Sequence, residues 1–278
     1  MPDPRWYDCP VIIPYMGGKF ELGRKLIPMI PKHDRYIEVF LGGGSIFFRK
    51  RKAKLNVLND KHNDLINLYL VVMHHYEIFI NHCESLLKSR TFFDGFKKEL
   101  KEDLEYIYMP DPKRAAKYFY IIKNAFNTNF HNPIGKEAEW NDKMWNCLKT
   151  SRDALKDTMI ENLDFRELFH RYPTRKGDFW YLDPPYVIAG ERGDYYVHSL
   201  DMDDHDALFE MCKQIDSEDG KFMISYDNHD YVNDTYKDFK IKKIPIKYPG
   251  QVHGSDYKNE LVITNYNPVN IQLKLMGD

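Results

Sequence analysis

The chain has 278 residues, of which 43% are hydrophobic and 29% are charged, and it carries 40 Lys and Arg against 42 Asp and Glu. This length and composition are typical of a folded globule of one or two domains, and they exclude a wholly disordered chain. The formal net charge of −2 excludes a protein that binds polyanions through bulk positive charge alone.

The charge is nevertheless divided unevenly along the chain. Residues 1–178 carry 30 basic and 24 acidic side chains, whereas residues 179–278 carry 10 and 18. This asymmetry favours a polyanion partner for the basic part, and the alternative is that these charges only cover solvated faces. The four scattered cysteines contain no Cys-x-x-Cys pair, and no apolar run reaches the ~18 residues of a membrane span. We therefore predict a cytoplasmic protein without a disulfide framework or a zinc site.

The N-terminal part predicts two strands around a glycine-rich turn. Residues 36–40 are β-branched or aromatic and lead directly into Gly42-Gly43-Gly44, which indicates a strand followed by a tight turn. Ser45 is placed to cap a helix that continues through residues 46–48. A second strand is expected over residues 55–58.

The rest of the chain changes from a helical pattern to alternating helices and strands. From residue 63 to residue 123 apolar side chains recur with a helical period, and residues 124–141 are typical of an exposed loop or ribbon. A helix is expected at 203–215, and strands are expected at 158–163, 178–182, 222–226, 241–246 and 261–265. This alternation predicts a mostly parallel sheet with helices on both faces. We expect one α/β domain that a helical insertion interrupts after its second strand.

The end of the first predicted strand carries a candidate ligand site. Parallel sheets bind ligands at the carboxyl ends of their strands, and glycines there let a ligand approach the backbone N–H groups. Asp60 follows Gly42 by 18 residues, a spacing that suits a carboxylate bonded to the ribose hydroxyls of a nucleoside cofactor. Phe47 occupies the position of the third glycine of a pyrophosphate motif, so a cofactor with a ribose and no phosphate fits better. A glycine turn without a ligand is the alternative.

Asp183-Pro184-Pro185-Tyr186 is the most informative stretch, and it follows a hydrophobic strand. The prolines fix the backbone, so the Asp183 carboxylate and the Pro184 carbonyl are held in place as two hydrogen-bond acceptors for one –NH₂ group. Tyr186 can stack on a planar ring that bears this amine. Fixed acceptors favour the amine as it rehybridises and attacks, which is electrostatic preorganisation. A plain Pro-Pro turn is the alternative.

The sequence resembles the class alpha, or Dam-type, adenine-N6 DNA methyltransferases over most of its length and in the same motif order. The motifs that carry this resemblance are Tyr15-Met16-Gly17-Gly18-Lys19, Glu38-Val39-Phe40-Leu41-Gly42-Gly43-Gly44-Ser45, Asn59-Asp60-Lys61-His62-Asn63-Asp64-Leu65-Ile66, Asn162-Leu163-Asp164-Phe165, Asp183-Pro184-Pro185-Tyr186 and Lys258-Asn259-Glu260-Leu261. The first two are similar to the family's cofactor motifs, and the third is similar to its acidic ribose motif. The fourth sits where the family contacts the cofactor adenine, the fifth is its catalytic tetrapeptide, and the last resembles its C-terminal Lys-x-x-Glu-Leu segment. Val39 replaces the usual Pro and Tyr15 stands where Trp is common, which bears on cofactor affinity rather than on activity.

The resemblance implies methyl transfer from S-adenosyl-L-methionine to adenine N6 in double-stranded DNA after base flipping, with S-adenosyl-L-homocysteine as product and no metal. It implies a Rossmann-like S-adenosylmethionine-dependent methyltransferase sheet with an inserted helical DNA-recognition domain. The catalytic domain then spans residues 1–64 and 151–278, and the target-recognition insertion spans residues 65–150. The implied catalytic residues are Asp183, Pro184 and Tyr186. The implied cofactor-binding residues are Tyr15, Lys19, Phe40, Gly42, Gly44, Ser45, Asp60, Asp164, Phe165 and Asp183.

The segment 123–127 resembles the start of the family's DNA-contacting hairpin, and the residues after it diverge from the family. The candidate DNA-binding residues of the insertion are Arg114, Lys117, Lys123, Asn127 and His131, and for each a solvated surface position is the alternative. The expected partner is double-stranded DNA and not a membrane, with a cognate restriction endonuclease as a candidate further partner. We expect a monomer or weak dimer in the cytoplasm of a bacterial or phage-infected cell.

Two other functions stay open at this point. The same chemistry could act on RNA adenine or on cytosine N4, although the leading Asp183 and the Dam-like motif order argue against both. A catalytically silent DNA-binding module is the second alternative. The intact Gly42, Asp60 and Asp183 argue against it.

Overall fold

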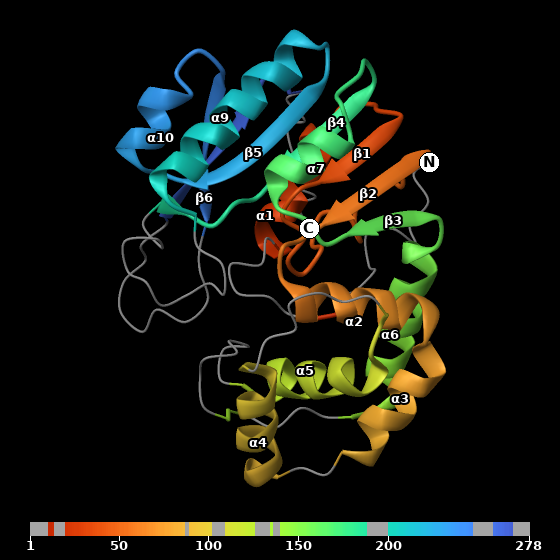
Figure 1. The fold of residues 1–278 in the computed structure, drawn as a ribbon. Helices are drawn as coiled ribbons and strands as arrows, with labels where there is room; N and C mark the ends of the chain where they lie inside the picture. Colours follow the sequence, from red (N-terminus) through yellow and green to blue (C-terminus); the bar gives the residue numbers. More distant parts are fainter. Residues whose placement is uncertain are drawn as a thin grey trace, which may run out of the picture. The chain divides into compact units, whose positions relative to one another are not determined.

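The computed structural model describes residues 11–13, 20–86, 89–101, 109–125, 134–135, 140–187, 200–246 and 258–268 (Figure 1). The chain forms two compact units. The first unit draws its described residues from Met1–Lys19, Leu41–Lys52 and Asn56–Asp164. The second unit draws them from Phe20–Phe40, Ala53–Leu55 and Phe165–Asp278.

The described part of the second unit contains five strands, paired in the order β1-β4-β5-β7-β6. β4 pairs in parallel with β1 and with β5, whereas β7 runs antiparallel to both β5 and β6. All five residues of β4 are buried, which explains its nearly continuous hydrophobic sequence. The strands are β1 (Arg35–Glu38), β4 (Asp178–Leu182), β5 (Lys221–Asp227), β6 (Lys240–Ile246) and β7 (Lys258–Thr264).

Helices pack on these strands. The longest, α9, begins with a capping box in which the Asp201 side chain accepts from Asp204 N (2.9 Å) and the Asp204 side chain accepts from Asp201 N (3.1 Å). Leu208, Cys212 and Ile215 on its inner face are fully buried, and α9 packs on β5 (Figure 1). The helices of this unit are α1 (Phe20–Leu26), the 3₁₀ turn η2 (Ile27–Met29), α7 (Phe165–Arg171), α9 (Met202–Ser217) and α10 (Asp230–Thr235).

The first unit contains a parallel pair of strands and a helical block between them in sequence. β2 (Leu55–Asn59) pairs with β3 (Thr158–Glu161), and Asn59 lies opposite Glu161. The regular elements described between the two strands are helices, apart from one antiparallel bridge between Ala125 and Ile134. The helices are α2 (Asn63–His74), α3 (Tyr76–Ser85), α4 (Arg90–Lys101), α5 (Pro112–Asn124) and α6 (Asp142–Leu155).

α5 is the central helix of this block and contacts α2, α3 and α4 (Figure 1). Pro112 occupies its first turn, and the Asp111 carboxylate caps it by accepting from Lys113 N (2.9 Å) and Arg114 N (3.0 Å). Its buried residues include Ala116 and Phe119, so small and aromatic side chains together fill the space between neighbouring helices.

The predicted α/β architecture is confirmed, and so is each predicted strand, although most strand ends differ by one to three residues. One prediction is wrong: no helix begins at Ser45, since residues 45–49 form turns. Phe48 N donates to Gly44 O (3.0 Å) and Lys50 N donates to Ile46 O (2.9 Å), which amounts to a single helical turn. The chain loses this pattern by Arg51, too early to offset the cost of helix nucleation. None of the described helices combines the length and the apolar character needed to cross a membrane.

Candidate functional site

The glycine turn after β1 adopts a conformation that requires glycine. Gly42 and Gly44 have positive φ values of 47° and 67°. A Cβ atom on Gly44 would lie 2.8 Å from the Phe48 ring and 3.2 Å from the Tyr69 hydroxyl oxygen. The turn therefore leaves no room for a side chain at this position, and its backbone is packed closely against α2.

The structure brings the predicted acidic residue to this turn. Asp60 Oδ2 accepts from Gly42 N (2.9 Å), and Oδ1 accepts from His62 N (2.9 Å). The Tyr69 hydroxyl donates to Gly42 O (2.9 Å), which fixes the same peptide from its other side. Burial raises the pKa of Asp60, and the hydrogen bonds from the two N–H groups oppose this rise. Each carboxylate oxygen can accept more than one hydrogen bond, so this arrangement is compatible with ribose hydroxyls.

The end of β3 is tied to the end of β2. The Asn59 side chain accepts from Leu163 N (2.9 Å) and donates to Leu163 O (3.1 Å), and Asn162 Nδ2 donates to Asp60 O (2.9 Å). Asp164 follows directly, and its carboxylate pairs with Lys61 Nζ at 3.0 Å. Asp60 and Asp164, which the sequence assigns to one cofactor, therefore lie at the same edge of the first unit.

Two further predicted cofactor residues pack together in the second unit. The rings of Phe40 and Phe165 are 5.9 Å apart between centroids, and the Arg166 guanidinium lies over the Phe165 ring at 4.4 Å. Phe165 also lines a groove of about 580 Å³ between α7 and α9. Of the other predicted cofactor residues, Ser45 lies in the turn, and Tyr15 and Lys19 fall outside the described residues.

The predicted catalytic tetrapeptide follows β4, and its side chains contact β5 and β7. Ser225 Oγ on β5 donates to Asp183 Oδ1 at 3.0 Å, and the Tyr181 hydroxyl lies 3.1 Å from the same Ser225 oxygen. The Tyr186 hydroxyl donates to Glu260 on β7. Pro184 is buried. The acidic and aromatic side chains of the tetrapeptide are thus each held by a neighbouring strand.

Buried acidic and phenolic groups surround this tetrapeptide. Tyr36 on β1 donates to Glu38 Oε2 at 2.8 Å, and Glu38 and Glu260 are each 2% exposed. Burial raises the pKa of Tyr36 and Tyr181 well above the usual range. The charge of Glu38 raises the pKa of Tyr36 further, and the charge of Asp183 does the same for Tyr181. Both phenols therefore stay protonated at neutral pH and can act as donors.

Sequence reasoning missed three of these residues as part of the site. Ser225 and Tyr181 lie inside predicted strands, where a hydroxyl gives no signal of its partner. Glu260 lies in the Lys-x-x-Glu-Leu segment, which could have suggested it, but the segment alone does not identify Tyr186 as its partner.

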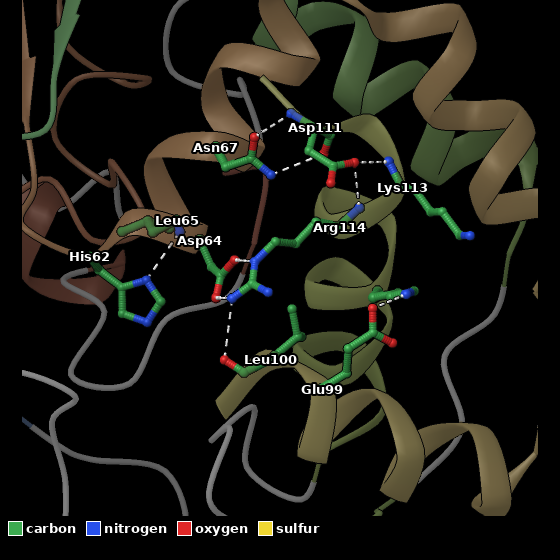
Figure 2. Close-up of polar contacts among 10 residues, drawn as sticks. His62, Asp64, Leu65, Asn67, Glu99, Leu100, Asp111, Lys113 and Arg114 are labelled. Atoms are coloured by element: carbon green, nitrogen blue, oxygen red, sulfur yellow. Dashed lines mark hydrogen bonds and ion pairs between the residues drawn. The ribbon is translucent and has the colours of Figure 1, made fainter. Parts of the chain in front are cut away.

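Arg114, a predicted DNA contact, forms a largely buried ion pair. Its Nε donates to Asp64 Oδ1 (2.6 Å), and one terminal nitrogen donates to Asp64 Oδ2 (3.1 Å) and to Leu100 O (3.3 Å), as Figure 2 shows. The two side chains are 12% and 10% exposed. Beside them, Asn67 accepts from Asp111 N (2.8 Å) and donates to Asp111 O (3.0 Å). These contacts join α2, α4 and α5, and they disfavour the predicted DNA contact of Arg114.

The other predicted DNA residues of α5 also have partners within the unit. Lys117 pairs with Glu99 and lies over the Phe96 ring at 5.5 Å, with its side chain 12% exposed. Lys123 lies over the Phe119 ring at 5.2 Å, and burial lowers the pKa of its amine. Asn127 and His131 fall outside the described residues. In the described ranges no three His, Cys, Asp or Glu side chains are grouped so that they could hold a metal ion.

Comparison with known proteins gives a match over most of the chain. The family model described as D12 class N6 adenine-specific DNA methyltransferase matches residues 15–248. The type II methyltransferase M1.LlaDCHI of Lactococcus lactis subsp. cremoris is 27% identical over 274 residues, which cover 91% of this chain and 94% of that protein. The type II methyltransferase M.MjaIII of Methanocaldococcus jannaschii is 26% identical, covering 91% and 97%. The DNA adenine methylase of Serratia marcescens is 24% identical, covering 78% and 82%.

Proposed function

The chain belongs to the D12 class of N6 adenine-specific DNA methyltransferases, and we propose that its methyl donor is S-adenosyl-L-methionine and its substrate double-stranded DNA. The observation that carries this proposal is the tetrapeptide after β4. Its carboxylate accepts a hydrogen bond from Ser225, and its tyrosine donates one to Glu260. A plain Pro-Pro turn would have no need of these contacts from two other strands.

The residues around the glycine turn fit such a cofactor. The bound cofactor would supply an electrophilic methyl group and leave as S-adenosyl-L-homocysteine. Gly42 and Gly44 allow the positive φ values of the turn, and Asp60 offers acceptors for ribose hydroxyls. We assign Asp164 to the adenine of the cofactor, and we assign Phe40, Ser45 and Phe165 to the binding of the same cofactor. We assign Tyr15 and Lys19 to the other end of the cofactor, and we propose no metal.

The tetrapeptide would hold the target amine. Asp183 and the Pro184 carbonyl accept its two N–H groups, which favours the positive charge that develops on nitrogen as the new bond forms. Tyr186 stacks on the base, and its hydroxyl is anchored by Glu260. Because these groups follow a strand and cannot enter a duplex, the adenine must flip out of the helix.

We propose that residues 65–150 form the target-recognition insertion. Lys117 and Lys123 on α5 would lie near the phosphates, and Asn127 and His131 would read base edges. Arg114 would support this face through its pair with Asp64 instead of contacting DNA.

The names of two relatives, both type II methyltransferases, favour a restriction–modification role with a cognate endonuclease as partner. A DNA N-6-adenine-methyltransferase of Escherichia phage P1 is 29% identical over 123 residues, which cover 42% of this chain and 15% of that protein. It favours a phage role as the alternative. We propose that the protein acts as a monomer or weak dimer in the cytoplasm of a bacterial or phage-infected cell.

The test is transfer of tritium from S-adenosyl-L-[methyl-³H]methionine into double-stranded DNA, with RNA of the same sequence as competitor. We expect the label in N6-methyladenine of DNA and a loss of about 100-fold or more in the Asp183→Ala variant. Asp203→Ala, which removes an exposed carboxylate from α9, is the matched control and should keep full activity. Label in RNA or at cytosine N4, or full activity of Asp183→Ala, would refute the proposal.

A further inference from the structure

Asp183 and Ser225 meet because of the register between β4 and β5. Leu182 lies opposite Ile224 in this parallel pair, so the next residues are Asp183, which directly follows β4, and Ser225 on β5. Tyr181 precedes Asp183 by two residues, which places both side chains on the same side of the strand. Ser225 is fully buried and Tyr181 is 1% exposed. The contacts of 3.0 Å and 3.1 Å therefore form one chain of hydrogen bonds, Tyr181–Ser225–Asp183, whose first two members are buried.

The direction of this chain follows from the number of protons available. A serine hydroxyl has one proton, and an ionised carboxylate only accepts hydrogen bonds. Ser225 therefore uses its one hydrogen to donate a hydrogen bond to Asp183, and Tyr181 must donate a hydrogen bond to the serine oxygen. The pKa of Tyr181 is raised well above the usual range, mainly by burial and then by Asp183, so the phenol keeps the proton that this role needs.

We propose that Ser225 and Tyr181 are positioning residues that orient the Asp183 carboxylate toward the target amine and favour its ionised form. The proposal rests on the role of Asp183 as the acceptor of that amine. The terminal torsion of an aspartate is broad, so a fixed donor on one oxygen restricts where the other oxygen lies. A hydrogen bond to the charged form also favours that form.

Other acidic and phenolic side chains lie around Asp183. Glu38 on β1 and Glu260 on β7 act on the same Tyr181 phenol as Asp183, and Tyr36 on β1 interacts with both Glu38 and Asp183. Tyr186 contacts Glu260. Among these acidic groups, the Ser225 hydroxyl donates to Asp183, the carboxylate that must accept the amine.

The test compares single-turnover methylation rates of the full chain and its variants between pH 5 and pH 9, with saturating S-adenosylmethionine and DNA. In Ser225→Ala we expect a rate about 10- to 100-fold lower, because a hydrogen bond to a charged group is lost. We also expect the acid limb of the profile to move to higher pH, with S-adenosylmethionine affinity unchanged. Tyr181→Phe, which removes only the outer donor, should show the same shift with a smaller loss, about three- to tenfold.

Ser151→Ala, which removes a fully buried hydroxyl bonded to Cys147 O in α6, is the matched control and should leave the profile unchanged. Thermal unfolding of each variant identifies any that fails to fold. If Ser225→Ala does not fold, Tyr181→Phe tests the proposal in its place. A folded variant with a normal rate, or with a lower rate and an unmoved acid limb, overturns the positioning role. Different results would refute the proposed function itself: an inactive wild-type chain or a fully active Asp183→Ala variant.

Discussion

Gly44 is the residue of the glycine turn that tolerates change least. Its φ of 67° is unfavourable for any residue with a Cβ atom, and that atom would meet the Phe48 ring at 2.8 Å. We expect Gly44→Ala to lower the free energy of unfolding by about 1–3 kcal/mol. It should also weaken S-adenosylmethionine binding, because the displaced turn carries the Gly42 N–H that holds Asp60. Urea unfolding and calorimetric titration measure the two effects.

Gly95 in α4 is the matched control, since a Cβ atom there would meet nothing within 4 Å. Gly95→Ala should raise the free energy of unfolding by up to about 1 kcal/mol, because alanine favours a helix more than glycine does. Wild-type stability and affinity in Gly44→Ala would show that the turn is not packed as described.

Individual residues of the site differ in how far the sequence could predict them. Gly42 and Asp60 were predictable as a pair, because a glycine turn and an acidic residue one strand later form a recurring arrangement with a known spacing. Ser225 was not, because its role depends on which strand lies beside β4 and on a register that places it next to Asp183. The sequence of a strand contains neither piece of information.

At the scale of elements, one ion pair joins α2 to α5. The Asp64–Arg114 pair joins the first turn of α2 to the first turn of α5, and Arg114 also reaches Leu100 O at the end of α4 (Figure 2). Removing one partner of a buried pair leaves the other charge without compensation. We expect Arg114→Gln to lower the free energy of unfolding by about 3 kcal/mol, measured by urea unfolding.

The same variant separates this packing role from the DNA contact predicted for Arg114. A phosphate contact would appear in the salt dependence of DNA affinity, with a slope smaller by about one unit in the variant. We expect the slope to stay unchanged. Lys113→Gln, on the exposed side of the same turn, is the control and should change stability by less than about 0.5 kcal/mol. A normal stability with a reduced slope would favour the original DNA prediction.

Predictions of whole elements were reliable where a pattern was long, and they failed where packing decides the outcome. The helical period of α2 and α5 and the apolar run of β4 predict these elements directly. The helix expected at Ser45 did not form, because too few residues separate the turn from the extended chain before β2. The antiparallel direction of β7 was also not predicted. It is reasonable in physical terms, since only residues 247–257 separate β6 from β7 and a parallel connection needs a dozen or more.

For the whole molecule, motif order along the chain was more informative than composition. The net charge of −2 excluded a bulk-charge binder but did not exclude a DNA enzyme, because chemistry in a pocket needs few charges. Which basic residues lie free to meet DNA could not be predicted. Arg114 and Lys117 carry the charge expected of DNA contacts, but each is paired with a carboxylate that lies far from it in the sequence.

One buried histidine takes no part in the proposed chemistry, and we expect it to affect the stability of the whole molecule. His205 on α9 is 1% exposed, and its Nδ1 lies 2.6 Å from the Tyr226 hydroxyl oxygen on β5. Burial lowers the pKa of this imidazole, and the nearby Asp204, Asp201 and Asp206 only partly oppose the effect. The folded protein therefore holds His205 in its neutral form.

This buried imidazole makes the folded state lose stability as the pH falls. In the unfolded chain the imidazole has its ordinary pKa of about 6.5, so at a pH between the lowered folded value and 6.5 the unfolded state binds more protons. Stability contributed by neutral His205 is therefore present above about pH 6.5 and is lost below it. We expect the difference in unfolding free energy between wild type and His205→Gln to shrink from pH 7.5 to pH 5, measured by urea unfolding. A pH-independent difference for His205→Gln would mean that the folded state does not depress the titration of this imidazole.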